Sequence, residues 1–149
     1  MEAADRKHPG DRERPCIVED GEHFDRRYAA ASQAGPLAVE LHALGTDYRA
    51  TGYTTREQAD ELGRLLELTP GDVLLDLGAG CGWPGLYLSS NHGCMVISTD
   101  TVIEGSITAH DRILRDRLAD RAMAIVATGD DLPIRPGSID AVVHTDVMC

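Results

Sequence analysis

Val73-Leu74-Leu75-Asp76-Leu77-Gly78-Ala79-Gly80-Cys81-Gly82-Trp83-Pro84-Gly85 is the most informative segment of this chain. Its first five residues form a short apolar run that one aspartate interrupts, and a run of this length is typical of a strand buried on both faces of a sheet. Glycine then occupies every second position, where it lets the backbone take positive φ and lets a ligand approach without meeting a Cβ atom. Pro84 fits the first turn of a following helix. The segment therefore predicts a nucleotide-binding loop between a strand and a helix.

Two kinds of cofactor fit such a loop. Gly80-x-Gly82-x-x-Gly85 satisfies the dinucleotide fingerprint, and Asp100 ends the next apolar run about 20 residues on, where an acid accepts from ribose hydroxyls. Asp76, however, lies at the end of the predicted strand, just before the loop. A carboxylate at this position repels a pyrophosphate and attracts an ammonium group. The acid thus favours a cofactor that carries an amino acid over one that carries phosphates.

The pattern Asp76-x-Gly-x-Gly-x-Gly resembles the first motif of class I S-adenosylmethionine-dependent methyltransferases. Met95–Asp100 is similar to the family's second strand, and Ala127–Ile134 resembles the segment after its third strand, in which a Leu-Pro step is frequent. Pro136–Val143 is similar to the family's turn into the fourth strand. The match covers about residues 53 to 149.

This resemblance implies that S-adenosylmethionine is the cofactor. Asp100 matches the acid that holds the ribose, and the segment after the third strand lines the adenine. Many relatives carry an acid or amide where this chain has Thr128, so the residue that meets the adenine amine stays open among Thr128, Gly129, Asp130 and Asp131. The implied cofactor-binding residues are Asp76, Gly78, Ala79, Gly80, Gly82, Asp100, Thr101, Gly129, Asp130, Asp131 and Thr145.

The sequence identifies no catalytic residue. Methyl transfer from a sulfonium is an in-line displacement, so catalysis rests on holding two reactants at attack distance rather than on a dedicated nucleophile. If the acceptor is an oxygen or an acidic carbon, a general base helps. His144 and Asp146, at the carboxyl end of the predicted fourth strand, are placed to serve as that base.

The order of the predicted elements indicates the fold class. A capping box that starts at Thr54 or Thr55 opens a helix that runs to about residue 68. The later elements are helices over 84–90 and 104–119 and strands over 95–100, 122–127 and 139–145. The buried face of the helix over 104–119 is predicted to consist of Ile107, Ile113, Leu114 and Leu118. This alternation predicts an α/β fold with a Rossmann-like, doubly wound and mostly parallel sheet and helices on both faces.

The chain divides into three regions. Residues 1–21 are charged, contain proline and have almost no apolar positions, which predicts a disordered arm. Residues 22–52 suggest an N-terminal helical cover, broken near Gly35-Pro36. Residues 53–149 form an S-adenosylmethionine-binding domain that we expect to be incomplete, because a domain of this class resembles a seven-stranded sheet and its strands beyond the fourth are absent. We expect the open edge of the fourth strand to invite a partner chain or a second copy, as a homo-oligomer.

Composition and charge narrow the class of partner. The formal net charge is −11, which disfavours nucleic acid because such binding depends on neutralising phosphates. The chain has neither an apolar run of transmembrane length nor a signal peptide, so we expect no membrane contact and a soluble protein in the cytoplasm. Its four cysteines have no CxxC spacing, which predicts no metal site.

Three functional hypotheses follow. The favoured one is methyl transfer from S-adenosylmethionine to a small-molecule acceptor, by the whole protein or by a chain that supplies its cofactor-binding half. The second is an NAD(P)-binding Rossmann oxidoreductase fragment. The third is a noncatalytic remnant that keeps the fold and has lost cofactor binding.

Overall fold

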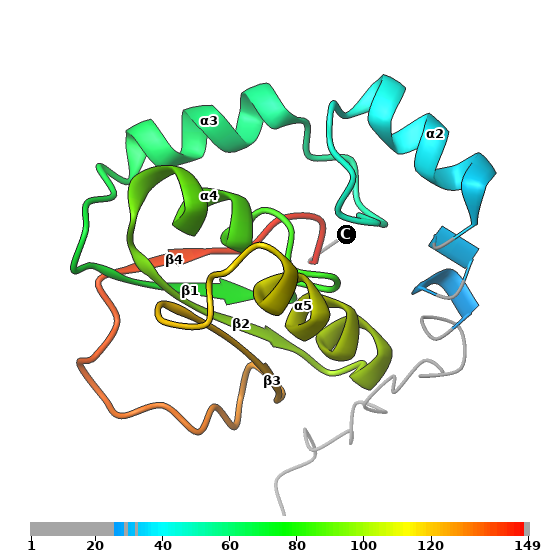
Figure 1. Cartoon of the computed structure of the whole chain (residues 1–149). Coiled ribbons are helices and arrows are strands. Elements are labelled where there is room, and N and C mark those ends of the chain that lie inside the picture. Colours follow the sequence, from blue (N-terminus) through cyan, green and yellow to red (C-terminus); the bar gives the residue numbers. More distant parts are fainter. Residues whose placement is uncertain (1–25, 29, 32, 148–149) are drawn as a thin grey trace, which may run out of the picture.

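A four-stranded parallel sheet forms the centre of the computed structural model, which describes residues 26–28, 30–31 and 33–147 (Figure 1). The predicted disordered arm at residues 1–21 lies outside the described residues. The strands are β1 Val73–Leu77, β2 Met95–Asp100, β3 Ala122–Val126 and β4 Ala141–Val143. Their order is β3-β2-β1-β4, and every pair is parallel. This arrangement confirms the predicted doubly wound sheet.

The strand order reverses between β1 and β4. From β1 the chain adds β2 and then β3 on one side, and it returns to place β4 on the other side of β1. In open α/β sheets such a switch point leaves a crevice outside the carboxyl ends of the strands, and ligands bind there. The topology therefore fixes where the site must lie.

Two helices cover one face of the sheet. α4 (Gly85–His92) and α5 (Ile103–Arg115) pack on the side chains of Leu74, Val96 and Val143 in a single core cluster (Figure 1). Side chains of the alternate sheet positions point to the opposite face, where Met95, Met123 and Val142 are about half exposed. The segment between β3 and β4 contains no helix, so α4 and α5 cover one face of the sheet rather than helices covering both faces as predicted.

α5 differs from its prediction in length and in its buried face. The helix ends at Arg115 because Arg117 takes a positive φ of 59°, so Leu118 is buried from outside the helix. Ile107 and Leu114 are 54% and 56% exposed, contrary to prediction. The buried side consists instead of Gly105, Ser106, Ala109 and Ile113. Small residues are required because a Cβ on Gly105 would lie 3.0 Å from the carbonyl oxygen of Gly80.

The helix before β1 begins where the capping box predicts. α3 (Arg56–Leu65) has Thr55 as its N-cap, and the side chains of Thr55 and Gln58 each accept from the other's backbone N–H. The helix ends three residues earlier than predicted. α4 runs two residues past the predicted end at residue 90 and stops at Gly93, which takes the left-handed conformation with a φ of 76°.

The break between the N-terminal helices lies earlier in the chain than predicted. Residues 26–28 and 30–31 are helical, and α2 spans Ala34–Ala43 after an N-cap at Gln33. The break therefore precedes Gly35-Pro36, which lie in the first turn of α2, where a proline is tolerated. Among the residues with described positions, no helix has the length and apolar character needed to cross a membrane.

Strand β4 is shorter than the predicted 139–145. At its start the carboxylate of Asp140 accepts a hydrogen bond from the N–H of Val73 at 2.8 Å. Beyond its end Asp146 takes a positive φ of 58°, which no strand residue adopts. The chain thus leaves the sheet at the point where the site begins.

Candidate functional site

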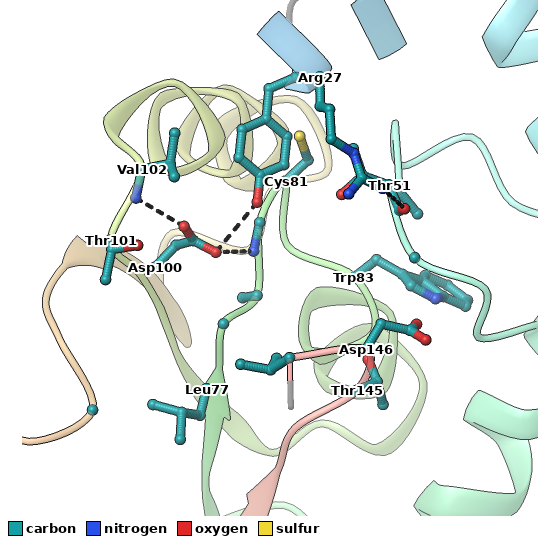
Figure 2. Close-up of a pocket in the computed structure, with 18 of the residues that line it drawn as sticks. Arg27, Thr51, Leu77, Cys81, Trp83, Asp100, Thr101, Val102, Thr145 and Asp146 are labelled. Atoms are coloured by element: carbon teal, nitrogen blue, oxygen red, sulfur yellow. Dashed lines mark hydrogen bonds between the residues drawn. The ribbon is translucent and has the colours of Figure 1, made fainter. Parts of the chain in front are cut away.

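A cavity of about 370 Å³ opens at the carboxyl ends of the strands, at the switch point (Figure 2). Its size is that of a small-molecule site. The walls come from the glycine loop, from the ends of β2 and β4, from the segment after β3 and from two N-terminal segments. Of the predicted cofactor-binding residues, the lining includes Gly78, Ala79, Gly80, Asp100, Thr101, Gly129 and Thr145. It does not include Asp76, Gly82, Asp130 or Asp131.

The glycine loop contributes main-chain atoms to the cavity wall. The N–H groups of Gly78 and Ala79 both donate to the carbonyl oxygen of Thr99, at 2.8 and 2.9 Å. Gly78 and Gly80 have positive φ values of 72° and 52°. A Cβ on Gly80 would lie 2.9 Å from the hydroxyl oxygen of Tyr28, so no larger residue fits. This loop can hold a ligand against main-chain atoms.

Asp100 is the buried acid at the end of β2. Its Oδ2 accepts from the N–H of Gly80 at 2.8 Å, and its Oδ1 accepts from the N–H of Val102 at 2.8 Å (Figure 2). The hydroxyl of Tyr28 donates to the same Oδ2 at 3.4 Å. One carboxylate therefore joins the glycine loop, the start of α5 and the N-terminal helical segment around the cavity.

Asp76 lies beneath the loop rather than in the cavity wall. Its side chain is buried, and Oδ2 accepts from the N–H of Gly85, the first residue of α4, at 2.8 Å. Burial raises the pKa of Asp76 to about 7. The hydrogen bond from Gly85 opposes this shift, and the charge of Asp100 adds to it. Direct contact of Asp76 with a cofactor stays a prediction.

The raised pKa of Asp76 predicts how the stability of the fold depends on pH. Between the unfolded pKa of 3.8 and the folded pKa of about 7, the folded protein binds the Asp76 proton and the unfolded chain releases it. Asp76 thus stabilises the fold less as the pH rises through this window, by at most about 4 kcal/mol for three pKa units. Urea denaturation at pH 4.5 and 7.5 should show this loss in the wild type and not in Asp76→Asn. Equal pH dependence in the two proteins would contradict it.

The end of β4 is tied to the segment before α3. Oδ2 of Asp146 accepts from the N–H of Tyr53 at 2.9 Å and from the N–H and the hydroxyl of Thr54 at 3.2 and 2.9 Å. A Cβ on Gly52 would overlap the carboxylate of Asp146. These contacts give Asp146 a structural role in the cavity wall. His144, the other candidate base, is exposed and does not line the cavity.

The segment after β3 places one of the four adenine candidates at the cavity. All four residues are exposed, and Gly129 is the one of them that lines the cavity. A backbone bridge between Thr128 and Asp131 closes a tight turn around Gly129. Ala127 and Gly129 are thus the residues of this segment that line the cavity.

Arg27 and Tyr28 are among the lining residues that the sequence-based prediction of the site did not name. Arg27 donates from Nη2 to the carbonyl oxygen of Thr51 at 2.8 Å, and Tyr28 contacts Asp100. Burial and the neighbouring Asp100 raise the pKa of Tyr28, so its hydroxyl keeps the proton that it donates. No sequence pattern distinguishes Arg27 from Arg26, because only the fold brings this segment to the cavity.

No protein-family model matches the chain. The 27-O-demethylrifamycin SV methyltransferase of Amycolatopsis mediterranei is 31% identical over 102 residues, which are 68% of this chain and 38% of that enzyme. A geranyl diphosphate methyltransferase, solved with its substrate and sinefungin, is 25% identical with a TM-score of 0.56, over 59% of this chain and 33% of that one. An S-adenosylmethionine-dependent methyltransferase of Geobacter sulfurreducens, solved with S-adenosylhomocysteine, is 28% identical with a TM-score of 0.50. The match covers 58% of this chain and 35% of that one.

The parallel sheet, the glycine loop and the acid at the end of β2 define a Rossmann-like cofactor-binding domain. Together with these relatives, they place the chain in the class I S-adenosylmethionine-dependent methyltransferases, whose cofactor is S-adenosylmethionine. The chain spans about two-fifths of the curated relative that it matches.

Proposed function

We propose that this chain binds S-adenosylmethionine in the cavity at the switch point and supplies the cofactor site for methyl transfer to a small molecule. The observation that carries the proposal is the buried carboxylate of Asp100 beside the main chain of Gly80 in the cavity wall. A carboxylate at the end of β2 is placed to accept from ribose hydroxyls. The glycine loop next to it contributes main-chain atoms to the same cavity wall.

The charges around the cavity favour this cofactor over a dinucleotide. Asp100 and Asp146 are the two acidic residues of its described lining. A pyrophosphate would meet these two carboxylates, whereas a sulfonium and an ammonium group are attracted by them. The electrostatics therefore support a cofactor with an amino-acid end.

When bound, S-adenosylmethionine supplies an electrophilic methyl group, which the acceptor takes while the electron pair of the broken bond stays on sulfur. The residues of this chain bind the cofactor and orient it. Asp100 and the segment around Gly129 fix the nucleoside end, and the glycine loop supports the remainder. Tyr28 and Trp83, both buried in the lining, exclude water from this space. Holding the reactants in one geometry is the main rate advantage that such a site offers.

Two observations support a small-molecule acceptor. The names of the rifamycin and geranyl diphosphate relatives state small-molecule substrates. The net charge of −11 opposes a polyanionic acceptor such as nucleic acid.

Titration calorimetry of the 149-residue chain tests the proposal. We expect S-adenosylmethionine and S-adenosylhomocysteine to bind with dissociation constants in the micromolar range, and NADH to bind at least about tenfold more weakly. Circular dichroism of the same sample confirms that the chain is folded. Preferential binding of NADH would support the oxidoreductase hypothesis, and a folded chain that binds none of the three ligands would support the noncatalytic one.

A further inference from the structure

The charged residues of the cavity are unevenly distributed. Within the described part of the lining, Asp100, Asp146 and Arg27 carry formal charge, and Arg27 is the cation of this set. S-adenosylmethionine carries a carboxylate as well as its two cationic groups. The two aspartates repel that carboxylate, so its position in the cavity depends on where Arg27 lies.

The strand order gives a bound cofactor a direction. Gly129 follows β3, Asp100 ends β2, the glycine loop follows β1, and Thr145 follows β4. Because the sheet order is β3-β2-β1-β4, these positions form a row in that sequence. A ligand with adenine at Gly129 and ribose at Asp100 therefore extends over the glycine loop, and its amino-acid end reaches the β4 side.

Arg27 lies at that same side. Its guanidinium donates to the carbonyl oxygen of Thr51 at 2.8 Å, and the following residue, Gly52, packs directly against the carboxylate of Asp146 beyond β4. Figure 2 shows Arg27 extending across the top of the cavity to Thr51, on the side away from Asp100. The neighbouring residue Tyr28 contacts Asp100 instead. One short helical segment thus places a phenol at the ribose end and a guanidinium at the other end.

We propose that the guanidinium of Arg27 binds the carboxylate of the cofactor's methionine moiety and makes the cavity selective for ligands that retain it. This inference rests on the proposed function. A guanidinium has five N–H donors in a planar fork that matches a carboxylate, and a charge-assisted pair of this kind is strong and directional. The nearby carboxylate of Asp146 favours the ammonium group of the same moiety over a second anion.

Three ligands separate this role from a general effect on the cavity. S-adenosylhomocysteine carries the complete amino acid, its decarboxylated analogue S-adenosyl-3-thiopropylamine lacks only the carboxylate, and 5′-methylthioadenosine lacks the whole amino-acid end. We expect Arg27→Ala to weaken binding of S-adenosylhomocysteine by about 10- to 100-fold, the value of a charged hydrogen-bonded pair. We expect its effect on the other two ligands to stay within about twofold. Titration calorimetry on the full chain measures all three.

Two further variants sharpen the test. Arg27→Lys should recover part of the lost affinity, because it keeps the charge and not the planar fork. Arg26→Ala removes an exposed arginine that does not line the cavity, and it should leave all three affinities unchanged. An equal loss for S-adenosylhomocysteine and 5′-methylthioadenosine in Arg27→Ala, or no loss for either, would overturn the inference alone. A folded wild type that binds none of these ligands would overturn the proposed function, and this inference with it.

Discussion

Asp100→Asn is expected to weaken binding of S-adenosylhomocysteine by about 100-fold or more, because two effects add. Under the proposed function the variant loses the charge that accepts from ribose hydroxyls, and each charged hydrogen bond contributes about 1.5 to 3 kcal/mol. In the wild type the backbone N–H groups of Gly80 and Val102 both donate to the carboxylate. The side-chain amide of asparagine places its own N–H against one of these two donors. The loop that forms the cavity wall is then less firmly held. Titration calorimetry measures the affinity, and thermal unfolding by circular dichroism measures the accompanying change in stability.

Asp140→Asn is the matched control for this variant. Asp140 is also an aspartate next to a strand, and it also accepts a backbone N–H, that of Val73. It lies before β4, at the end of the sheet opposite the cavity. Its substitution should lower stability to a comparable or smaller extent and leave cofactor affinity within about twofold of wild type. If Asp140→Asn and Asp100→Asn weakened binding equally, the effect of Asp100 would be one of general stability.

The parts of the fold that sequence reasoning predicted are those with a local cause. The apolar run over 73–77 is a strand because its side chains are buried within a parallel sheet, and that burial leaves a direct mark on composition. The capping box at Thr55 and Gln58 is a local pair of hydrogen bonds, and it marks the start of α3 correctly. Gly93 marks the end of α4 because few other residues adopt positive φ.

The parts that were missed depend on long-range contacts. The buried face of α5 was predicted from its large apolar residues, yet the helix packs so close to the glycine loop that Gly105 and Ala109 face inward while Ile107 stays exposed. Helical periodicity locates an apolar stripe but not the distance to the neighbouring backbone. Arg27 and Tyr28 belong to the site for a similar reason. They reach the cavity across more than 70 residues of chain from Asp100, and no local pattern records that approach.

The predicted site residues likewise fall into two groups, those that line the cavity and those that pack behind the loop. Gly78, Gly80 and Asp100 were assigned to the cofactor and do line the cavity, because the motif that carries them is itself the strand-to-loop geometry. Asp76 and Gly82 belong to the same motif but face away from the cavity. Gly82 packs against Leu86 and Ala109, and Asp76 packs beneath Gly85. A motif therefore contains residues that hold the loop as well as residues that meet the ligand, and only the fold separates the two.

Gly85→Ala is expected to destabilise the protein by about 3 kcal/mol, although alanine is the better helix former. Gly85 opens α4, and its substitution at a solvent-exposed helix position would gain up to about 1 kcal/mol. Here a Cβ would lie 2.5 Å from Oδ2 and 2.7 Å from Cβ of the buried Asp76. Overpacking of this kind costs about 1 to 3 kcal/mol, and displacement of Asp76 from the N–H of Gly85 leaves a buried polar group unpaired, at a further 1 to 3 kcal/mol. The cost exceeds the gain because neither side chain can move into solvent.

Gly35→Ala provides the comparison, because nothing apart from its two chain neighbours lies within 4 Å of a Cβ built on Gly35 in the first turn of α2. That variant should change the free energy of unfolding by less than about 1 kcal/mol, because the helix propensity that alanine adds is opposed by the contact of its Cβ with the ring of the following Pro36. Urea denaturation at 25 °C and pH 7.5 measures both changes in the free energy of unfolding. A loss below about 1 kcal/mol for Gly85→Ala would mean that β1 and α4 can separate freely, contrary to the tight contact between Asp76 and Gly85. A large loss for Gly85→Ala with little change for Gly35→Ala would establish that this contact, rather than helix propensity, requires glycine at the start of α4.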